Sequence, residues 1–348
     1  MLQCYCGLAS GLRAKINYEC KTNHYFTWKK SFLIAALLAA VSRLNAQHYQ
    51  AGSEGIKCGS PPASGFSVED FNSFYSANQM LGFDGALNHG YSLFRYTQAP
   101  VLTWMTGWDI LGAEYGMSVR VPFVYQRTTG TFPHLPWVPS RSTTKIQSGL
   151  ADIEVEPIKL GWRFKRFDLT VGYSFFAPSG NYNNKQLFLY NLGEGYWTHS
   201  ISLGATFYLD HDKTWAVSLL NRFDINTKQY STLVNEPVSP SHPFGVASED
   251  TTLGCIYTLE WAVSKTVVRG VDIGITGYYQ QQVTDTENPM GNGPTLNNEK
   301  IRVGGIGPEI RGNYEKWGLS GSLRYAYEFS AMDHPQGNLI TLTITKSF

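Results

Sequence analysis

Charged side chains occupy alternate positions in several segments that are otherwise rich in apolar and aromatic residues. Residues two apart in a strand point to the same face, so this pattern gathers carboxylates and guanidinium groups on one side of a sheet. If that side encloses a lumen, both signs of charge could select which solutes pass, or opposite charges could pair and hold the wall in shape. The candidates are Glu114, Arg120, Asp152, Glu154, Glu156, Arg222, Asp224, Glu260, Asp272, Arg324 and Glu328.

The sequence contains little that suggests catalysis. His199 and Ser200 form the one strand-borne pair worth naming, but adjacent strand residues point to opposite faces and cannot act together without a further group. No His-x-x-x-His or Cys-x-x-Cys spacing follows residue 46, so we predict no metal site and no cofactor. Only Cys58 and Cys255 follow that residue. We expect free thiols, although an oxidising compartment would also allow a bridge between them.

The composition differs from that of soluble enzymes and of helical membrane proteins. Charged residues make up 16% of the chain and aromatic residues 14%, whereas soluble domains carry about 25% charged residues. The longest apolar run, residues 31–41, is shorter than the roughly 20 residues that a membrane helix needs. The net charge of +1 with scattered Lys and Arg gives no reason to expect nucleic acid as a partner.

Residues 1–46 read as an N-terminal extension that ends in a signal peptide. The apolar run 31–41 follows Lys29 and Lys30, and it leads into Leu44-Asn45-Ala46. Basic residues, a short apolar run and a small-residue cleavage pattern together are typical of secretory signals. We therefore expect export and a mature chain that begins at Gln47.

From residue 66 onward the sequence alternates with period two, which indicates β-strands. In 317–329, for example, Trp, Leu, Tyr and Phe share one face, while Gly, Ser, Arg and Glu share the other. We predict strands near 66–81, 96–110, 112–126, 148–164, 167–180, 196–210, 214–229, 251–267, 271–285, 299–315, 317–332 and 336–348.

A soluble sandwich would show the same alternation with its apolar face inward, so the links between strands decide the fold. They alternate between long (82–95, 127–147, 181–195, 230–250, 286–298) and short (111, 165–166, 211–213, 268–270, 316), and only 333–335 breaks the rhythm. Short turns at one end and longer loops at the other are typical of outer-membrane barrels. We predict an all-β transmembrane antiparallel up-and-down β-barrel of about twelve strands over 66–348, preceded by a Gly/Pro-rich leader at 47–65.

Three local features add to this interpretation. Aromatic side chains near strand ends would suit a girdle at the membrane interface: Trp108, Trp162, Trp197, Trp215, Trp261 and Trp317. The final alternating strand closes on Phe348, which resembles the signal that the barrel assembly machinery reads. The apolar face changes parity at Pro157, which predicts a one-residue bulge at or near that residue.

Several motifs resemble one family. They are His48-Tyr49-Gln50, Gly59-Ser60-Pro61-Pro62, Ser148-Gly149-Leu150-Ala151-Asp152, the run Tyr278 to Asp285, and Gly305-Ile306-Gly307-Pro308. Across 47–348 the chain is similar to the family named for the meta-pathway of phenol degradation. It has Ala51 where a family motif places Pro after His-Tyr. The resemblance implies an outer-membrane barrel, often called a transporter, that is associated with the breakdown of aromatic compounds.

Eight strands leave an interior filled by side chains, whereas about 16 to 18 leave an open channel. We therefore expect a narrow pore, or a lumen partly blocked by residues 47–65, which are either a plug or a periplasmic tail. We predict an outer-membrane channel or transporter for passive uptake of small solutes, including aromatic or hydrophobic compounds. The alternatives are a structural or adhesive barrel and, less favoured, a lipid-modifying enzyme.

The expected partners are outer-membrane lipids and lipopolysaccharide of a Gram-negative cell, the barrel assembly machinery and a small-molecule solute. The loop 131–139 is unusually apolar for an exposed loop. It could gather hydrophobic solutes, contact lipopolysaccharide or pack over the barrel mouth.

Overall fold

Antiparallel strands account for nearly all regular structure. The computed structural model describes residues 47–82, 87–88, 90–132, 141–183, 191–235, 246–287 and 300–348. No helix within these ranges is long and apolar enough to cross a membrane. The elements are β1 (Gly65–Leu81), β2 (Leu87–Asn88), β3 (Ser92–Ile110), β4 (Ala113–Arg120), β5 (Phe123–Phe132), β6 (Arg141–Leu150), β7 (Ile153–Arg163), β8 (Phe167–Ala177), β9 (Thr198–Tyr208), β10 (Trp215–Asn226), β11 (Lys228–Asn235), β12 (Val246–Thr252), β13 (Ile256–Val268), β14 (Val271–Gln282), β15 (Arg302–Tyr314), the short 3-10 helix η2 (Glu315–Trp317), β16 (Leu319–Met332) and β17 (His334–Ser347).

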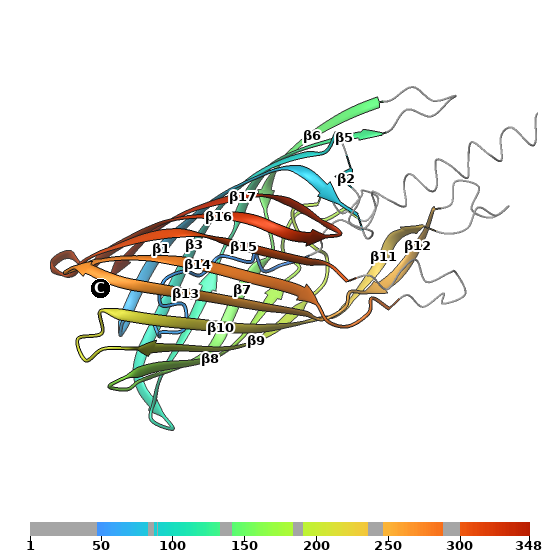
Figure 1. Ribbon diagram of the computed structural model, residues 1–348. Coiled ribbons are helices and arrows are strands. Elements are labelled where there is room, and N and C mark those ends of the chain that lie inside the picture. Colours follow the sequence, from blue (N-terminus) through green and yellow to red (C-terminus); the bar gives the residue numbers. More distant parts are fainter. Residues whose placement is uncertain are drawn as a thin grey trace, which may run out of the picture.

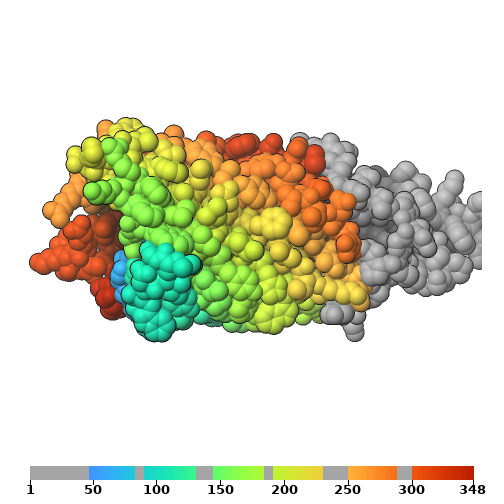
Figure 2. Space-filling view, turned by 90° about the horizontal axis from the view of Figure 1, so that it is seen from below, coloured from blue at the N-terminus to red at the C-terminus, as the bar shows by residue number. Residues whose placement is uncertain are grey.

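The strands close into an antiparallel barrel of 12 strands, which confirms the predicted fold class. Around the wall the order is β1, β17, β16, β15, β14, β13, β10, β9, β8, β7, β4 and β3, and β3 pairs again with β1. The pairs β5–β6 and β11–β12 prolong two of the hairpins at the end opposite the C-terminus (Figure 1). Figure 2 shows the middle strands, coloured green to orange, packed side by side into a wall.

The predicted strands overlap the observed ones, and the largest differences lie at two of the long links. Residues 127–147 and 230–250 were expected to be loops, but β5, β6, β11 and β12 occupy much of both. Thr-rich stretches such as Thr128–Thr131 and Thr143–Thr144 pair across the β5–β6 ladder, because β-branched residues fit extended backbone well. The remaining part of the apolar loop, 133–139, lies outside the described residues.

The apolar face of the wall points outward. In β9, Ile201 and Leu203 are 55% and 49% exposed, whereas Ser200 and Thr206 are 1% and 0% exposed. In β16, Leu323 and Tyr327 are exposed while Arg324 and Glu328 are buried. A soluble sandwich would bury the apolar set instead. An apolar exterior around a polar interior is the arrangement that a closed sheet needs in a bilayer.

The predicted bulge at Pro157 is confirmed. Between β4 and β7, the pairs Ser118–Glu156 and Gly116–Lys159 enclose one more residue on β7 than on β4. The ladder between β7 and β8 slips by the same amount between Val155 and Ile158. The extra residue moves the apolar side chains after Pro157 to the outer face.

Tryptophans mark strand ends, with one exception. Trp108 and Trp317 are 63% and 64% exposed near short turns, and Trp197 is exposed just before β9. Trp261, expected at a strand end, instead lies in the middle of β13, where it pairs with Leu219.

The two ends of the barrel differ. Short turns after β3, β7, β9, β13 and β15 share one end with the C-terminus, which we call the turn end; the other is the loop end. Asp333 alone separates β16 from β17 at the loop end, with φ of 46°. At the turn end, the Phe348 N–H donates to the Phe66 carbonyl at 2.9 Å, so the last residue meets the first strand.

Candidate functional site: the barrel interior

Residues 47–64, which we call the interior segment, lie inside the barrel before β1 begins. Tyr49 and Ile56 are only 5% and 3% exposed. Gly52 has φ of +79°, and a Cβ there would lie 2.6 Å from the Tyr278 ring on β14. Gly59 packs against the backbone of Ala205, where a Cβ would lie 2.3 Å from the carbonyl oxygen. Glycine therefore allows the segment to pass close to the wall.

Glu260 of β13 holds the middle of the interior segment. Its carboxylate accepts hydrogen bonds from the Tyr49 hydroxyl at 2.8 Å, the Gly52 N–H at 2.8 Å and the Glu54 N–H at 2.9 Å. The Glu260 side chain is 2% exposed. A buried carboxylate surrounded by donors forms stronger hydrogen bonds than neutral groups do.

Strands β15 and β16 bind the backbone of the next few residues. Glu309 accepts from the Ile56 N–H at 2.9 Å, and Arg311 donates to the Ile56 carbonyl at 3.1 Å. Arg324 donates to the carbonyls of Ser53, at 2.8 Å, and Glu54. The wall therefore satisfies backbone groups of a segment that has no secondary structure of its own.

Ion pairs fix the segment toward the turn end. Lys57 lies 2.9 Å from Asp272 of β14. Arg163 of β7 lies 2.7 Å from Glu114 of β4 and donates to the Pro62 carbonyl. Both wall carboxylates were among the sequence candidates, and here their partners belong to, or contact, the interior segment.

The start of the segment is held near the loop end. His48 Nε2 lies 2.8 Å from Asp152 Oδ2, both side chains are 2% exposed, and His48 Nδ1 lies 2.8 Å from the Thr198 hydroxyl. The ring stacks on Phe176 with centroids 4.9 Å apart. Asp152 also accepts from the Glu194 N–H at 2.6 Å, so one carboxylate joins the segment to the loop after β8.

Glu194 brings a second carboxyl group to this end. Burial, reinforced by the negative charge of Asp152, raises the pKa of Glu194 to about 8, while Arg95 acts in the opposite direction. The carboxyl group is therefore mostly neutral at pH 7 and can donate a proton to an acceptor.

Opposite charges pair along the wall rather than standing as separate rings. Arg222 of β10 lies 2.8 Å from Glu154 and 3.0 Å from Asp224, and its guanidinium lies 4.2 Å from the Tyr49 ring centroid. Arg120 lies 3.7 Å from Glu154. The structure thus brings four of the sequence candidates into one network that touches the interior segment.

The remaining candidates have separate partners. Glu328 accepts from the hydroxyls of Tyr75 and Tyr278 at 2.6 and 2.8 Å. Glu156 lies 2.9 Å from Lys159 and accepts from Ser118. Glu328 thus joins β16 to β1 and β14, and Glu156 joins β7 to β4. Neither carboxylate binds the interior segment in these contacts.

Sequence reasoning missed several interior residues: Glu309, Arg311, Arg163, Lys57 and Arg95. For Glu309 and Arg311 the sequence did contain a signal, because they alternate with the apolar residues Ile306 and Ile310. In the structure these two isoleucines lie on the outer face of β15 and are 40% and 50% exposed. Arg95 was placed in a loop because β3 begins at Ser92, earlier than expected.

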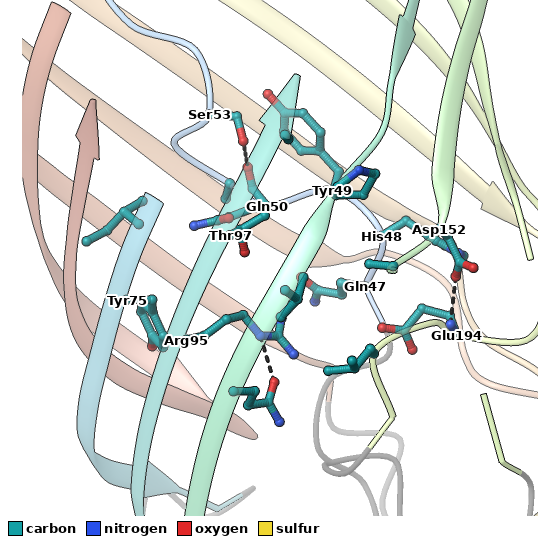
Figure 3. A pocket seen from close by; sticks show the side chains of 18 of the residues that line it. Gln47, His48, Tyr49, Gln50, Ser53, Tyr75, Arg95, Thr97, Asp152 and Glu194 are labelled. Carbon is teal, nitrogen blue, oxygen red and sulfur yellow. Dashed lines mark hydrogen bonds and ion pairs between the residues drawn. The ribbon is translucent and has the colours of Figure 1, made fainter. Parts of the chain in front are cut away.

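A cavity of about 180 Å³ lies between the interior segment and the wall near the loop end. Apolar residues of β1, β3 and β5 line one part of it, including Phe71, Leu93 and Val124. Arg95, Glu194 and the segment residue Gln47 line another part (Figure 3). The site therefore combines an apolar wall with a few polar groups, as small-molecule sites commonly do.

The groups considered for catalysis do not meet. Ser200 is buried inside the barrel and donates to Asp224, whereas His199 lies on the outer face and bonds the Tyr173 hydroxyl at 2.9 Å. Cys58 and Cys255 are free thiols. Within the described ranges, no group of three or more His, Cys, Asp or Glu side chains is arranged to hold a metal ion.

Comparison with solved structures gives a match that supports the barrel fold and several weaker ones. An outer membrane channel from Pseudomonas putida F1 matches with a TM-score of 0.61 and 12% identity, covering 83% of this chain and 97% of that chain. The KdgM porin matches with a TM-score of 0.40 and 9% identity over 81% and 99% of the two chains. The CymD monoaromatic hydrocarbon channel matches with 0.40 and 8% over 82% and 89%.

The curated proteins contain no match to this sequence. The family model described as putative MetA-pathway of phenol degradation matches residues 77–344, which is most of the barrel. The outward apolar face, the closed wall and this match together identify the chain as a member of the family of the putative MetA-pathway of phenol degradation.

Proposed function

We propose that the protein is an outer-membrane channel for passive uptake of small solutes, including aromatic or hydrophobic compounds. The observation that carries this proposal is the cavity of about 180 Å³ inside a closed barrel, with an apolar wall on one side and charged groups on the other. The monoaromatic hydrocarbon channel among the similar structures is compatible with such a solute.

In this proposal the interior segment acts as a plug. It follows the wall from Asp152 near the loop end to Glu114 near the turn end, so a solute that crosses must pass beside it or displace it. The eleven charged candidates would line the route. Their pairing, as in Arg222 with Glu154, would hold the plug and wall together and leave few free charges to retain ions.

We place the turn end in the periplasm and the loop end outside the cell, because outer-membrane barrels carry their short turns on the periplasmic side. Export would use the signal peptide in residues 1–46. The barrel assembly machinery would read the C-terminal strand that ends at Phe348. Outer-membrane lipids would surround the wall, and lipopolysaccharide would contact the long loops.

We further propose that the barrel is not an enzyme. The Ser200 hydroxyl donates a hydrogen bond to Asp224 within the lumen, and the His199 ring lies on the other side of the wall from this hydroxyl. A general base must lie within hydrogen-bond reach of its nucleophile. This separation favours transport over lipid hydrolysis.

Liposome swelling tests the proposal. Protein-loaded liposomes would be diluted into isotonic benzoate or into isotonic arabinose, and the same measurement would be made on a variant that lacks residues 47–58. We expect liposomes with wild-type protein to swell faster in benzoate than in arabinose. The deletion variant should swell faster in both solutes, and the ratio of its two swelling rates should be smaller. If neither form swells faster than protein-free liposomes, although both fold by heat-modifiable gel migration, passive uptake is wrong and a structural barrel is favoured.

A further inference from the structure

The cavity beside the interior segment contains donors that lack acceptors. Arg95 donates from Nε to Gln126 at 2.7 Å, and within the described part of the chain its terminal nitrogens have no carboxylate at ion-pair distance. The side-chain nitrogen of Gln47 is buried and has no partner there either. Figure 3 shows both side chains beside the same space. The buried Gln47 nitrogen without an acceptor costs about 1–3 kcal/mol. The half-buried Arg95 guanidinium adds a positive charge beside it, so the space favours a ligand that brings negatively charged acceptor oxygens.

Most carboxylates that line the cavity are already occupied by donors. His48 and two backbone N–H groups bind Asp152, Arg222 binds Glu154, and the Tyr75 hydroxyl binds Glu328. None of these three is free to neutralise Arg95, and the carboxyl group of Glu194, which also lines the cavity, is mostly neutral at pH 7. The guanidinium is therefore the group in this cavity that most needs a negative charge, because bidentate pairing with a carboxylate suits its geometry.

The rest of the cavity suits a single ring. Phe71, Leu93 and Val124 are 3%, 9% and 7% exposed and present apolar side chains to it. The volume is about 180 Å³, and an engineered apolar cavity of about 150 Å³ is known to hold one benzene molecule. A ring with one small polar substituent fits, whereas a disaccharide does not.

We propose that this cavity binds one aromatic monocarboxylate, with the carboxylate on Arg95 and Gln47 and the ring against Phe71, Leu93 and Val124. The proposal rests on the proposed function, because it names the solute class of the same interior. A dicarboxylate would place its second charge toward Asp152, where like charges repel. The site therefore selects monoanions over dianions as well as over neutral rings.

Titration calorimetry on the detergent-solubilised full barrel tests this, with benzoate, terephthalate and benzyl alcohol as probes. We expect wild type to bind benzoate at least tenfold more tightly than either of the others. Arg95→Gln should weaken benzoate binding about 10- to 100-fold, as expected for loss of a charge-assisted hydrogen bond, and should change benzyl alcohol binding less than threefold. Arg95→Lys should retain part of the benzoate affinity.

Arg127→Gln is the matched control, because Arg127 lies on β5 in the same part of the barrel but faces outward. Heat-modifiable migration would show that each variant folds. Equal benzoate affinity in wild type and Arg95→Gln would overturn the inference, as would equal binding of benzoate and terephthalate. If benzoate binds as expected but no solute crosses liposomes, the site stands and the transport proposal fails. If solutes cross but benzoate does not bind, the transport proposal stands and the binding site is wrong.

Discussion

The hydroxyl of Tyr49 donates a 2.8 Å hydrogen bond to the carboxylate of Glu260 inside the barrel. The two residues lie 211 positions apart in the sequence, and their contact joins the interior segment to the centre of β13. Because Gly52 and Glu54 bind the same carboxylate, Glu260 holds three residues of the middle of the segment.

Tyr49→Phe should loosen the interior segment without unfolding the barrel. Loss of one hydrogen bond to a charged group costs about 1.5–3 kcal/mol. The fraction of molecules in which the interior segment has left the wall should therefore rise about 10- to 100-fold. Cys58, whose sulfur lies 3.9 Å from the Glu260 carbonyl, reports on release. In a Cys255→Ser background we expect maleimide to label Cys58 correspondingly faster. Tyr257→Phe, on the outer face of β13, should leave the labelling rate unchanged. Equal labelling rates in the two variants would contradict the role given to the Tyr49–Glu260 hydrogen bond.

Gly59→Ala should also release the segment, for a steric reason. The added Cβ would lie 2.3 Å from the Ala205 carbonyl oxygen, and the rigid wall backbone cannot yield. Overpacking of this kind costs about 1–3 kcal/mol. We expect faster Cys58 labelling and a higher single-channel conductance. Gly312→Ala, where a Cβ meets nothing within 4 Å, is the control, and an unchanged conductance in Gly59→Ala would argue against close packing at this position.

The loop after β8 should be less stable at high pH. The pKa of Glu194 rises from its ordinary 4.5 to about 8 because of burial and Asp152, so the folded loop prefers the neutral carboxyl group. Its contribution to stability is fully present below about pH 4.5 and is lost as the pH rises through about 8. Hydrogen exchange of residues 191–197 should therefore lose protection between pH 5 and 9, after correction for intrinsic exchange. Glu194→Gln should remove much of this dependence.

His48 and Asp152 contact this loop in both proteins, so the difference between wild type and Glu194→Gln isolates Glu194. The turn at Asp210 provides an internal reference. Hydrogen bonds from the Trp215 N–H and the Thr214 hydroxyl lower the pKa of Asp210 to about 2, so that turn keeps one charge state across the range. Identical pH profiles in the two proteins would show that Glu194 does not titrate in this window.

Arg222→Met should destabilise the barrel itself. The substitution leaves Glu154 and Asp224 buried without their shared cation, and breaking a buried pair costs about 3–5 kcal/mol. The temperature at which gel migration changes should fall clearly, and a second substitution, Glu154→Gln, should recover part of the loss. Arg269→Met breaks an exposed pair with Glu315 and should change stability by less than about 1 kcal/mol. Equal effects of the two arginine substitutions would refute this account.

The sequence was sufficient to predict the wall because most strands obey one rule, apolar outward and polar inward. The rhythm of the links and the parity change at Pro157 were predicted for the same local reasons. The interior could be predicted only in part. Alternation places Glu260 and Arg222 inside, but it cannot say which groups they meet.

The partners of those groups come from a segment without periodicity. Tyr49, Gly52 and Lys57 bind residues more than 200 positions away, and neither spacing nor composition records such contacts. Arg95 was missed for another reason. The inner face of β3 carries Leu93, Ala99 and Val101, so apolar residues lie on both faces there and the alternation that defines a strand is weak.

The pairing of β1 with β17 joins Ser67 to Ser347 and Tyr75 to Leu339, residues near opposite ends of the barrel sequence. This seam cannot form until the last strand has been synthesised, so ring closure is the final topological step of assembly. The interior segment directly precedes β1 and must be enclosed when the seam closes or thread in afterwards. The interior segment is synthesised first, but it can form its contacts with Glu309 and Arg324 only after these late residues have been made.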